Sequence, residues 1–251
     1  MPLLRHVITY RGTLDGAQCL PDIDATVLEN LQTLSEVSNL KFGERVLKRI
    51  PNIKTLKLYY GDTSKEEDDY GLNKLCCLHK LASLRLRCSE QHTRVIREVS
   101  FPHSLKKLTL VNTKLPWEDI KLKIGSLPLL QVLKLERKSF TGSKWETFEN
   151  QFSTLKFLLI ESCDLEYWIT HNTHFPRLEH LVLRYIKFLR EIPSSIGCLP
   201  TLQSIKVKRC GDSVVDSAQR IKEEQEEFGN DGLQIYTCSY QDFLQVRTSL
   251  V

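Results

Sequence analysis

A short apolar pattern recurs along this chain at intervals of a little over twenty residues, and it limits the folds open to the sequence. The pattern is L-x-x-L-x-L, with Leu, Ile or Val at the three apolar positions. From Leu31 onward its copies start 22, 28, 24, 25, 25, 23 and 24 residues apart. Degenerate copies lie at Leu31/Leu34 and Leu4/Val7. Seven copies are complete: Ile53/Leu56/Leu58, Leu81/Leu84/Leu86, Leu105/Leu108/Leu110, Leu130/Leu133/Leu135, Leu155/Leu158/Ile160, Leu178/Leu181/Leu183 and Leu202/Ile205/Val207.

This repetition is typical of leucine-rich repeats. The last two apolar residues of each copy alternate with period 2, so both point to one face of a strand. One repeat cannot bury that face alone, whereas stacked neighbours share it as a parallel sheet. Each fully buried leucine contributes about 1.5–3 kcal/mol to stacking. We therefore expect an α/β solenoid, or horseshoe, with a parallel β-sheet on its concave face and an irregular or short-helical convex side.

The regularity of the pattern divides the chain into four parts. Residues 1–50 hold irregular N-terminal repeats, 51–210 the regular repeats, 211–240 a C-terminal capping helix and strand, and 241–251 a tail expected to be disordered. The acidic insertion at 61–70 predicts a solvated surface loop. Short helices are expected at 44–49, 117–124 and 145–152, from apolar spacing and composition. A longer helix is expected at 213–228, with an N-cap at Asp212 or Ser213, a stop at Gly229-Asn230, and a last strand at 233–237.

Composition sets few further limits on function. The net charge of +4 over 251 residues does not by itself indicate a nucleic-acid partner. No apolar run approaches 18 residues, and the first residues carry no signal-peptide pattern. Pro2 precedes Leu4 as Pro51 precedes Ile53, so the chain starts like the tail of a repeat. We expect it to be a piece of a longer protein.

The eight cysteines do not resemble a disulfide framework. Cys163 and Cys210 each follow the last apolar residue of a copy by three positions, where leucine-rich repeats place a buried Asn, Cys or Thr. Cys76, Cys77 and Cys88 have no partner at zinc-ligand spacing, and we interpret them as packing residues. The chain also has no N-x-[ST] glycosylation sequon. These features favour a reducing, intracellular location.

The sequence gives no sign of an enzyme, because its one formal match, S-x-x-K at Ser104–Lys107, lies across a copy of the repeat pattern. It has no G-x-x-x-x-G-K-[ST] or G-x-G-x-x-G loop for phosphates and no G-x-S-x-G nucleophile motif. His171, His174, His180 and Cys163 could suggest a metal site. However, His171 and His174 fall in a connection between strands, while His180 falls on a strand position that faces away from the core. We expect no catalytic residue, no metal site and no cofactor in this chain.

The open face of the predicted sheet carries most of the functional information. The x positions of the seven copies, with the residue after each copy, give 28 positions, of which eleven are basic and three acidic. This surface could be an ordinary solvated face or a docking surface for an acidic partner. Nucleic acid is not expected, because few aromatic residues could stack on bases. The candidate partner-binding residues are Lys54, Lys57, Tyr59, Arg85, Arg87, Lys106, Lys107, Lys134, Lys156, Phe157, Arg184, Lys206 and Lys208.

Several longer segments go beyond the generic repeat. They include F-P-H-S-L-K-K-L-T-L at 101–110, I-G-S-L-P-L-L-Q-V-L-K-L at 124–135 and H-F-P-R-L-E-H-L-V-L-R at 174–184. Others are F-T-G-S-K-W-E at 140–146, L-R-E-I-P-S-S-I-G at 189–197 and S-V-V-D-S-A at 213–218. Together, over roughly residues 50–240, the chain resembles the C-terminal leucine-rich-repeat domain of plant coiled-coil NLR immune receptors. The likeness is greatest to the nightshade group of late-blight and nematode resistance proteins and their helper receptors.

The resemblance implies a part of an intracellular immune switch. Such receptors carry a coiled coil and an NB-ARC nucleotide-binding domain, and ADP or ATP would bind in that domain rather than in this chain. The repeat domain would restrain the NB-ARC domain of the same receptor. It would also sense a pathogen effector or relay the signal of another immune receptor, leading to hypersensitive cell death. The implied location is the cytoplasm, with membrane association of the parent receptor on activation.

Two other classes of protein stay open at this point. A leucine-rich-repeat substrate adaptor of a ubiquitin ligase would need an F-box-like helical segment, which this sequence does not contain. A secreted receptor ectodomain would need paired cysteines at the ends of the repeat array.

Overall fold

The computed structural model describes residues 4–8, 14–15, 27–61, 69–90 and 98–238. The chain forms two compact units, Met1–Leu115 and Pro116–Val251. Of the acidic insertion predicted at 61–70, residues 62–68 lie outside the described residues, as does the tail at 241–251. Within the described part, no helix has the length and apolar character needed to cross a membrane.

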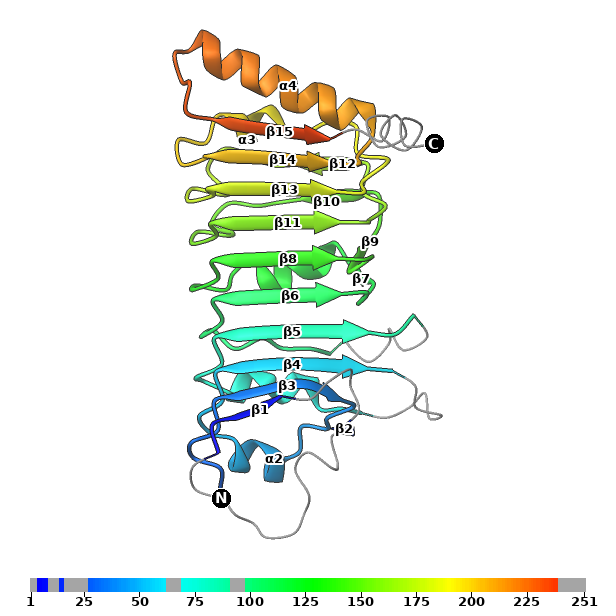
Figure 1. The fold of residues 1–251 in the computed structure, drawn as a ribbon, viewed down its shortest axis with the longest axis vertical. Helices are drawn as coiled ribbons and strands as arrows, with labels where there is room; N and C mark the ends of the chain where they lie inside the picture. The colour runs from blue at the N-terminus through cyan, green and yellow to red at the C-terminus, as the bar shows by residue number, and fades with distance from the viewer. Residues whose placement is uncertain (1–3, 9–13, 16–26, 62–68, 91–97, 239–251) are drawn as a thin grey trace, which may run out of the picture. The chain divides into compact units, whose positions relative to one another are not determined.

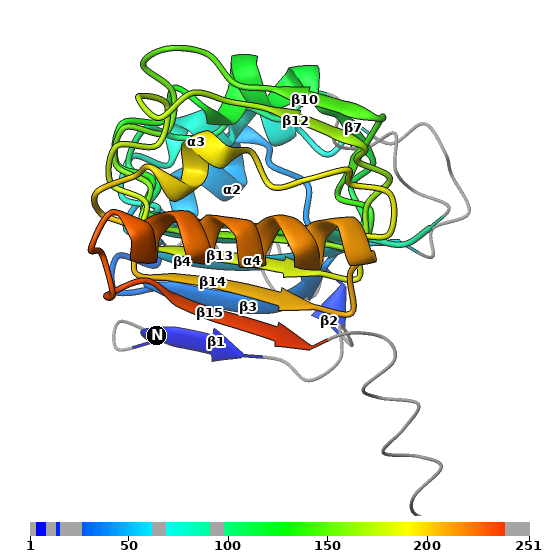
Figure 2. The same ribbon diagram turned by 90° about the horizontal axis from the view of Figure 1, so that it is seen from above.

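The first unit is built on a parallel sheet with the strand order β1-β3-β4-β5-β6, in which β2 also pairs with β3 (Figure 1). Helix α2 lies on one side of β3 and β4 (Figure 2). The first two strands are short, and a register shift between Leu34 and Val37 interrupts the pairing of β3 with β4. The elements are β1 (His6–Ile8), β2 (Leu14–Asp15), β3 (Thr33–Ser38), α2 (Glu44–Arg49), β4 (Thr55–Tyr60), the 3₁₀ helix η1 (Leu72–Cys77), β5 (Ser83–Cys88) and β6 (Lys107–Val111).

The second unit is built on a parallel sheet with the order β8-β11-β13-β14-β15. On one side of β13 and β14 lie α3 and the two short strands β10 and β12, which also pair in parallel (Figure 2). The strand β7 (Leu115–Pro116) spans the boundary of the two units. The other elements are η3 (Ile120–Ile124), β8 (Val132–Glu136), β9 (Phe140–Thr141), β10 (Lys144–Glu146), β11 (Phe157–Glu161), β12 (Tyr167–Ile169), β13 (His180–Arg184), α3 (Ser194–Gly197), β14 (Ser204–Lys208), α4 (Asp212–Glu227) and β15 (Gln234–Cys238).

Each complete copy of the apolar pattern forms a strand, as predicted. The second and third apolar residues lie on the strand and the first lies in the turn before it, and all 21 are buried. The turn is closed by a backbone hydrogen bond from the first apolar residue to the carbonyl three residues earlier, as in Leu105 N–H to Pro102 O (3.1 Å) and Leu178 N–H to Phe175 O (3.1 Å). Equivalent leucines are in register on paired strands, for example Leu56 with Leu84 and Leu84 with Leu108. The core of each unit is therefore a stack of matching leucine rows.

The predicted helix at 145–152 is wrong. Trp145 lies on β10, where it pairs in register with Trp168 of β12. The rings of Trp117, Trp145 and Trp168 stack with successive centroid distances of 5.1 Å, and Trp145 is buried. Stacking between repeats outweighs the local spacing of three to four residues, which also suited a helix. The segment at 117–124 does form a helix, whose turns from Ile120 to Ile124 are of the π type.

The C-terminal helix and strand form within one residue of their predicted bounds, as α4 and β15. The predicted N-cap is wrong, because Gly211 occupies that position and the Ser213 hydroxyl donates to Leu189 O (2.9 Å) instead. The helix stops as predicted, with Gly229 in the left-handed region (φ 75°). Val214, Ala218 and Ile221 form its buried stripe. This stripe contributes to the core of the second unit.

Candidate interaction surface

In the first unit, the sheet face opposite the leucine rows carries a basic hollow of about 360 Å³. Alternation along the strands places Lys57, Arg85 and Arg87 there, opposite the buried leucines of β4 and β5. Lys57 pairs in register with Arg85, and Ser83 pairs with Lys107. The hollow is lined by Glu36, Lys57, Leu58, Ser83, Leu84, Arg85, Arg87, Lys107 and Thr109. We refer to this side of the sheet in each unit as the open face.

The cations of this hollow are only partly neutralised. Neither Lys57 nor Lys107 forms an ion pair with any residue in the described ranges. The guanidinium of Arg87 lies 5.5 Å from the centre of the Tyr59 ring, so these two predicted site residues contact each other through a cation–π interaction. Like charges gathered on one surface favour association with an acidic partner.

Three predicted lysines border the open face instead of lying on it. Lys54, Lys106 and Lys156 each occupy the turn just before a strand, so the alternation of the strand does not point them to either face. All three are exposed. Lys156 is paired with Glu179, with 2.7 Å between Nζ and Oε1. The prediction that all x positions lie on the open face is therefore wrong for the first x position, which belongs to the amino-terminal edge of the sheet.

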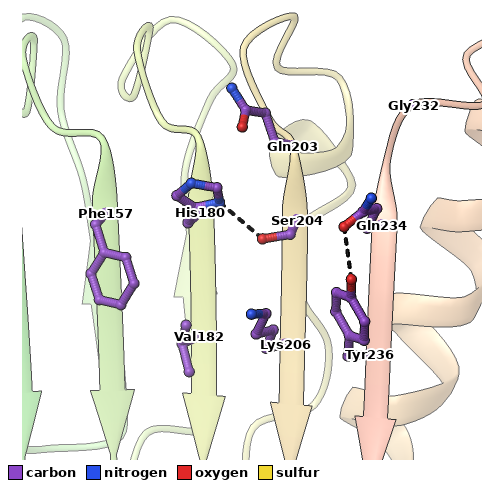
Figure 3. A pocket seen from close by; sticks show the side chains of 9 residues that line it. All are labelled: Phe157, His180, Val182, Gln203, Ser204, Lys206, Gly232, Gln234 and Tyr236. Atoms are coloured by element: carbon purple, nitrogen blue, oxygen red, sulfur yellow. Dashed lines mark hydrogen bonds between the residues drawn. The ribbon is translucent and has the colours of Figure 1, made fainter.

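In the second unit, the open face carries a hollow of about 400 Å³ that is more aromatic (Figure 3). The pairing register forms two rows across the strands: Phe157, His180, Ser204 and Gln234, and then Leu159, Val182, Lys206 and Tyr236. The hollow lies along these rows. It is lined by Phe157, His180, Val182, Gln203, Ser204, Lys206, Gly232, Gln234 and Tyr236.

The remaining predicted residues of this unit surround the hollow. The ammonium of Lys134 lies 5.4 Å from the centre of the Phe157 ring. Arg184 is 3.9 Å from Glu161, a partly exposed pair of little energetic weight. Lys208 is exposed on β14, next but one after Lys206. The structure thus gathers Phe157 and Lys206 at the hollow, with Lys134, Arg184 and Lys208 around it.

Gln234 and Tyr236 belong to this site, although the repeat pattern does not predict them. Strand β15 follows α4 and does not carry the full L-x-x-L-x-L pattern, so the pattern assigns its residues to neither face. The alternation of half-buried Ile235 with the more exposed Gln234 and Tyr236 is the signal that could have found them. Glu36, on irregular β3, was missed for a similar reason.

Each histidine considered as a metal ligand lies within hydrogen-bond distance of a side-chain hydroxyl, which for His171 is that of Thr173 at 3.2 Å. His174 Nδ1 lies 2.8 Å from the Thr147 hydroxyl, and burial and the neighbouring His171 lower the pKa of His174. His180 lies on the open face, with its Nδ1 3.0 Å from the Ser204 hydroxyl. Among the described residues, no group of three His, Cys, Asp or Glu side chains could hold a metal ion.

The seven cysteines in the described ranges are all free thiols. Cys88 and Cys210 are buried, as packing residues should be. Burial raises the pKa of both Cys88 and Cys163 to about 12. The interpretation of Cys76 and Cys77 as packing residues is wrong, because both are exposed on η1, whose buried positions are Leu72 and Leu75.

Comparison with known proteins places these features in a family. No protein-family model matches the chain. The late blight resistance protein homolog R1B-16 of Solanum demissum is 32% identical over 216 residues, which are 82% of this chain and 16% of that protein. The homolog R1B-23 of the same species is 30% identical over 230 residues, 90% of this chain and 18% of that protein. Late blight resistance protein R1-A of that species is 31% identical over 217 residues, 82% of this chain and 16% of that protein.

The chain spans about a sixth of the length of the curated relatives it matches. The alignments cover four fifths or more of this chain. The chain therefore belongs to the family of the late blight resistance proteins, as a homologue of one part of those longer proteins.

Proposed function

We propose that this chain is the leucine-rich-repeat interaction region of a cytoplasmic plant immune receptor, and that its open faces bind protein partners. The observation that carries the proposal is the hollow where Lys57, Arg85, Arg87 and Lys107 come together from three adjacent strands. Lys57 and Lys107 form no ion pair with a residue that the structure describes, so an acidic partner would compensate their charge. The names of the relatives support a role in plant disease resistance.

The strand geometry supports a solenoid as the fold of this region. In each unit, successive copies of one pattern form parallel strands in matching register, as with Leu158, Leu181 and Ile205 in the second unit. Such stacking leaves one sheet face open along the repeats, and repeat proteins use that surface to bind other proteins.

The first partner of the basic hollow is the receptor's own NB-ARC domain. In the resting receptor, acidic residues of that domain would dock on the first unit and hold the nucleotide switch in its ADP-bound state. A pathogen effector or another immune receptor would compete for the open faces and release the switch, leading to cell death. Nucleotide binding belongs to the NB-ARC domain in this scheme, and the present chain supplies the restraint.

The test is binding in trans between the full 251-residue chain and the separately expressed NB-ARC domain of the parent receptor, measured by isothermal titration calorimetry. Reversing Lys57, Arg85, Arg87 and Lys107 to Glu should weaken binding at least tenfold. Binding of the unchanged chain should also weaken as salt rises.

A matched variant controls for net charge in this titration. Arg45, Lys48, Lys74 and Lys80 are exposed cations of the same unit that lie outside its strands. Reversing these four to Glu changes the net charge as much as the first variant does. The affinity should stay within about twofold, because salt screens charges that lie far from the partner. An equal loss of affinity in both variants would show that the hollow is not the binding site.

A further inference from the structure

The hollow of the second unit differs in chemistry from that of the first. Its two outer strands carry aromatic rings, Phe157 on β11 and Tyr236 on β15 (Figure 3). Between them, Val182 is 5% exposed and Ser204 6% exposed, so these residues form a closed floor. The hollow is therefore a wide, shallow site with apolar walls, of a size that accepts one large side chain.

Hydrogen bonds hold the polar lining residues in place. The Tyr236 hydroxyl donates to Gln234 Oε1 at 2.7 Å, and His180 Nδ1 lies 3.0 Å from the Ser204 hydroxyl (Figure 3). Side chains ordered in advance lose less entropy when a ligand binds. Gln203 adds a further amide at the amino-terminal edge. These groups could meet a phenol O–H or an indole N–H at the rim of the hollow.

The charge around the hollow is uneven along the strands. At the amino-terminal edge, Lys156 is neutralised by Glu179. Toward the carboxyl ends, Lys206 lies 5.1 Å from the centre of the Tyr236 ring, and Lys208 follows it on β14. Neither Lys206 nor Lys208 forms an ion pair with a residue that the structure describes. A ligand in the hollow would therefore meet positive charge on one side.

We propose that this hollow receives an aromatic side chain of a protein partner, flanked by acidic residues that contact Lys206 and Lys208. Aromatic rings fit a site walled by Phe157 and Tyr236, because offset and edge-to-face ring contacts add to the free energy of burial. Flanking carboxylates complement the two lysines, and an open sheet face suits a peptide segment better than a free small molecule. The proposal rests on the proposed role of the chain in protein interaction and names the partner's chemistry.

The experiment is selection of a random dodecapeptide phage library on the immobilised full chain. Peptides with an aromatic residue beside Asp or Glu should be enriched. Fluorescence anisotropy with the synthetic winning peptide should then show at least tenfold weaker binding to the double variant Tyr236→Ala/Lys206→Gln. Tyr236 is 52% exposed and Lys206 is exposed, so circular dichroism should confirm that this variant folds.

A matched double variant of the first unit, Lys57→Gln/Arg87→Gln, should bind the winning peptide as the unchanged chain does. Selection without a consensus, or a consensus of acidic residues alone whose binding is lost in the first-unit variant, would overturn the proposal. Titration of the NB-ARC domain separates the two proposals. An NB-ARC domain that still binds while no peptide is selected would contradict only the aromatic site, whereas failure of the NB-ARC titration alone would contradict only the restraint.

Discussion

At the scale of single residues, the turn after the strands imposes an unusual backbone conformation. In the second unit, Arg137, Ser162, Tyr185 and Arg209 all have φ between 49° and 54°, and each stands two residues after the last apolar residue of its copy. Left-handed backbone is unfavourable for residues that carry a Cβ atom. The repeat therefore enforces a conformation that these four residue types do not favour, which is why the sequence gives little sign of it.

Replacing one of these residues with glycine should stabilise the protein. Arg137 is exposed, so Arg137→Gly loses little packing while it relieves the left-handed strain. We expect the free energy of unfolding to rise by about 0.5–1 kcal/mol, measured by urea denaturation. The control Lys134→Gly, in the interior of β8, should lower it by a similar amount. A loss of stability in both variants would contradict the account.

The buried thiol of Cys88 makes stability depend on alkaline pH. Burial raises the pKa of this thiol to about 12, whereas an unfolded cysteine titrates near 8.5. Between these values the unfolded chain releases the proton and the folded chain keeps it, so stability falls as the pH rises. Urea denaturation between pH 9.5 and 11 should therefore show that the free energy of unfolding falls less steeply with pH in Cys88→Ala than in the unchanged chain. The difference in slope should be up to about 1.4 kcal/mol per pH unit. Parallel curves for the two proteins would refute this assignment.

At the scale of elements, the stacked tryptophans show where local patterns stop being informative. Trp145 is held between Trp117 and Trp168, and the Phe152 and Phe175 rings contact it edge-on at 6.1 and 6.2 Å. Three of these four partners, Trp117, Trp168 and Phe175, lie more than twenty positions away in the sequence. The spacing within 145–152 predicts a helix because a local window does not contain these three rings.

Trp145→Ala should therefore be among the more damaging substitutions in the second unit. Removing a fully buried indole costs about 3–5 kcal/mol of unfolding free energy through lost burial and the cavity left behind. The neighbouring ring of Tyr167 on β12 is exposed and contacts Arg190 at 4.7 Å, so Tyr167→Ala should cost less than about 1 kcal/mol. Chemical denaturation of both variants measures the difference. Similar costs would show that the indole stack does not organise this part of the unit.

At the scale of the whole molecule, the sequence predicts the strands better than the site. The leucines recur every 22 to 28 residues. Each copy forms a strand because its leucines are buried against the equivalent leucines of the neighbouring strands. The residues of the open face do not have to match between strands. The alternation along a strand predicts which residues lie on that face, but it does not predict where the face forms a hollow. Tyr236 lines the same hollow as Phe157 because β15, which follows α4, pairs with β14. Lys54 lies at the edge of the sheet because it precedes the strand, where side chains do not yet alternate between the two faces. Neither feature can be read from a local window.

In the proposed interaction, the open face contacts the partner and the helical parts of the repeats do not. The most direct measurement is lysine acetylation footprinting by mass spectrometry, on the full chain alone and saturated with the NB-ARC domain. We predict that labelling of Lys57 and Lys107 falls at least fivefold in the complex, while Lys48 on α2 and Lys74 on η1 keep their labelling. Protection of Lys48 and Lys74 with unchanged labelling of Lys57 and Lys107 would contradict it.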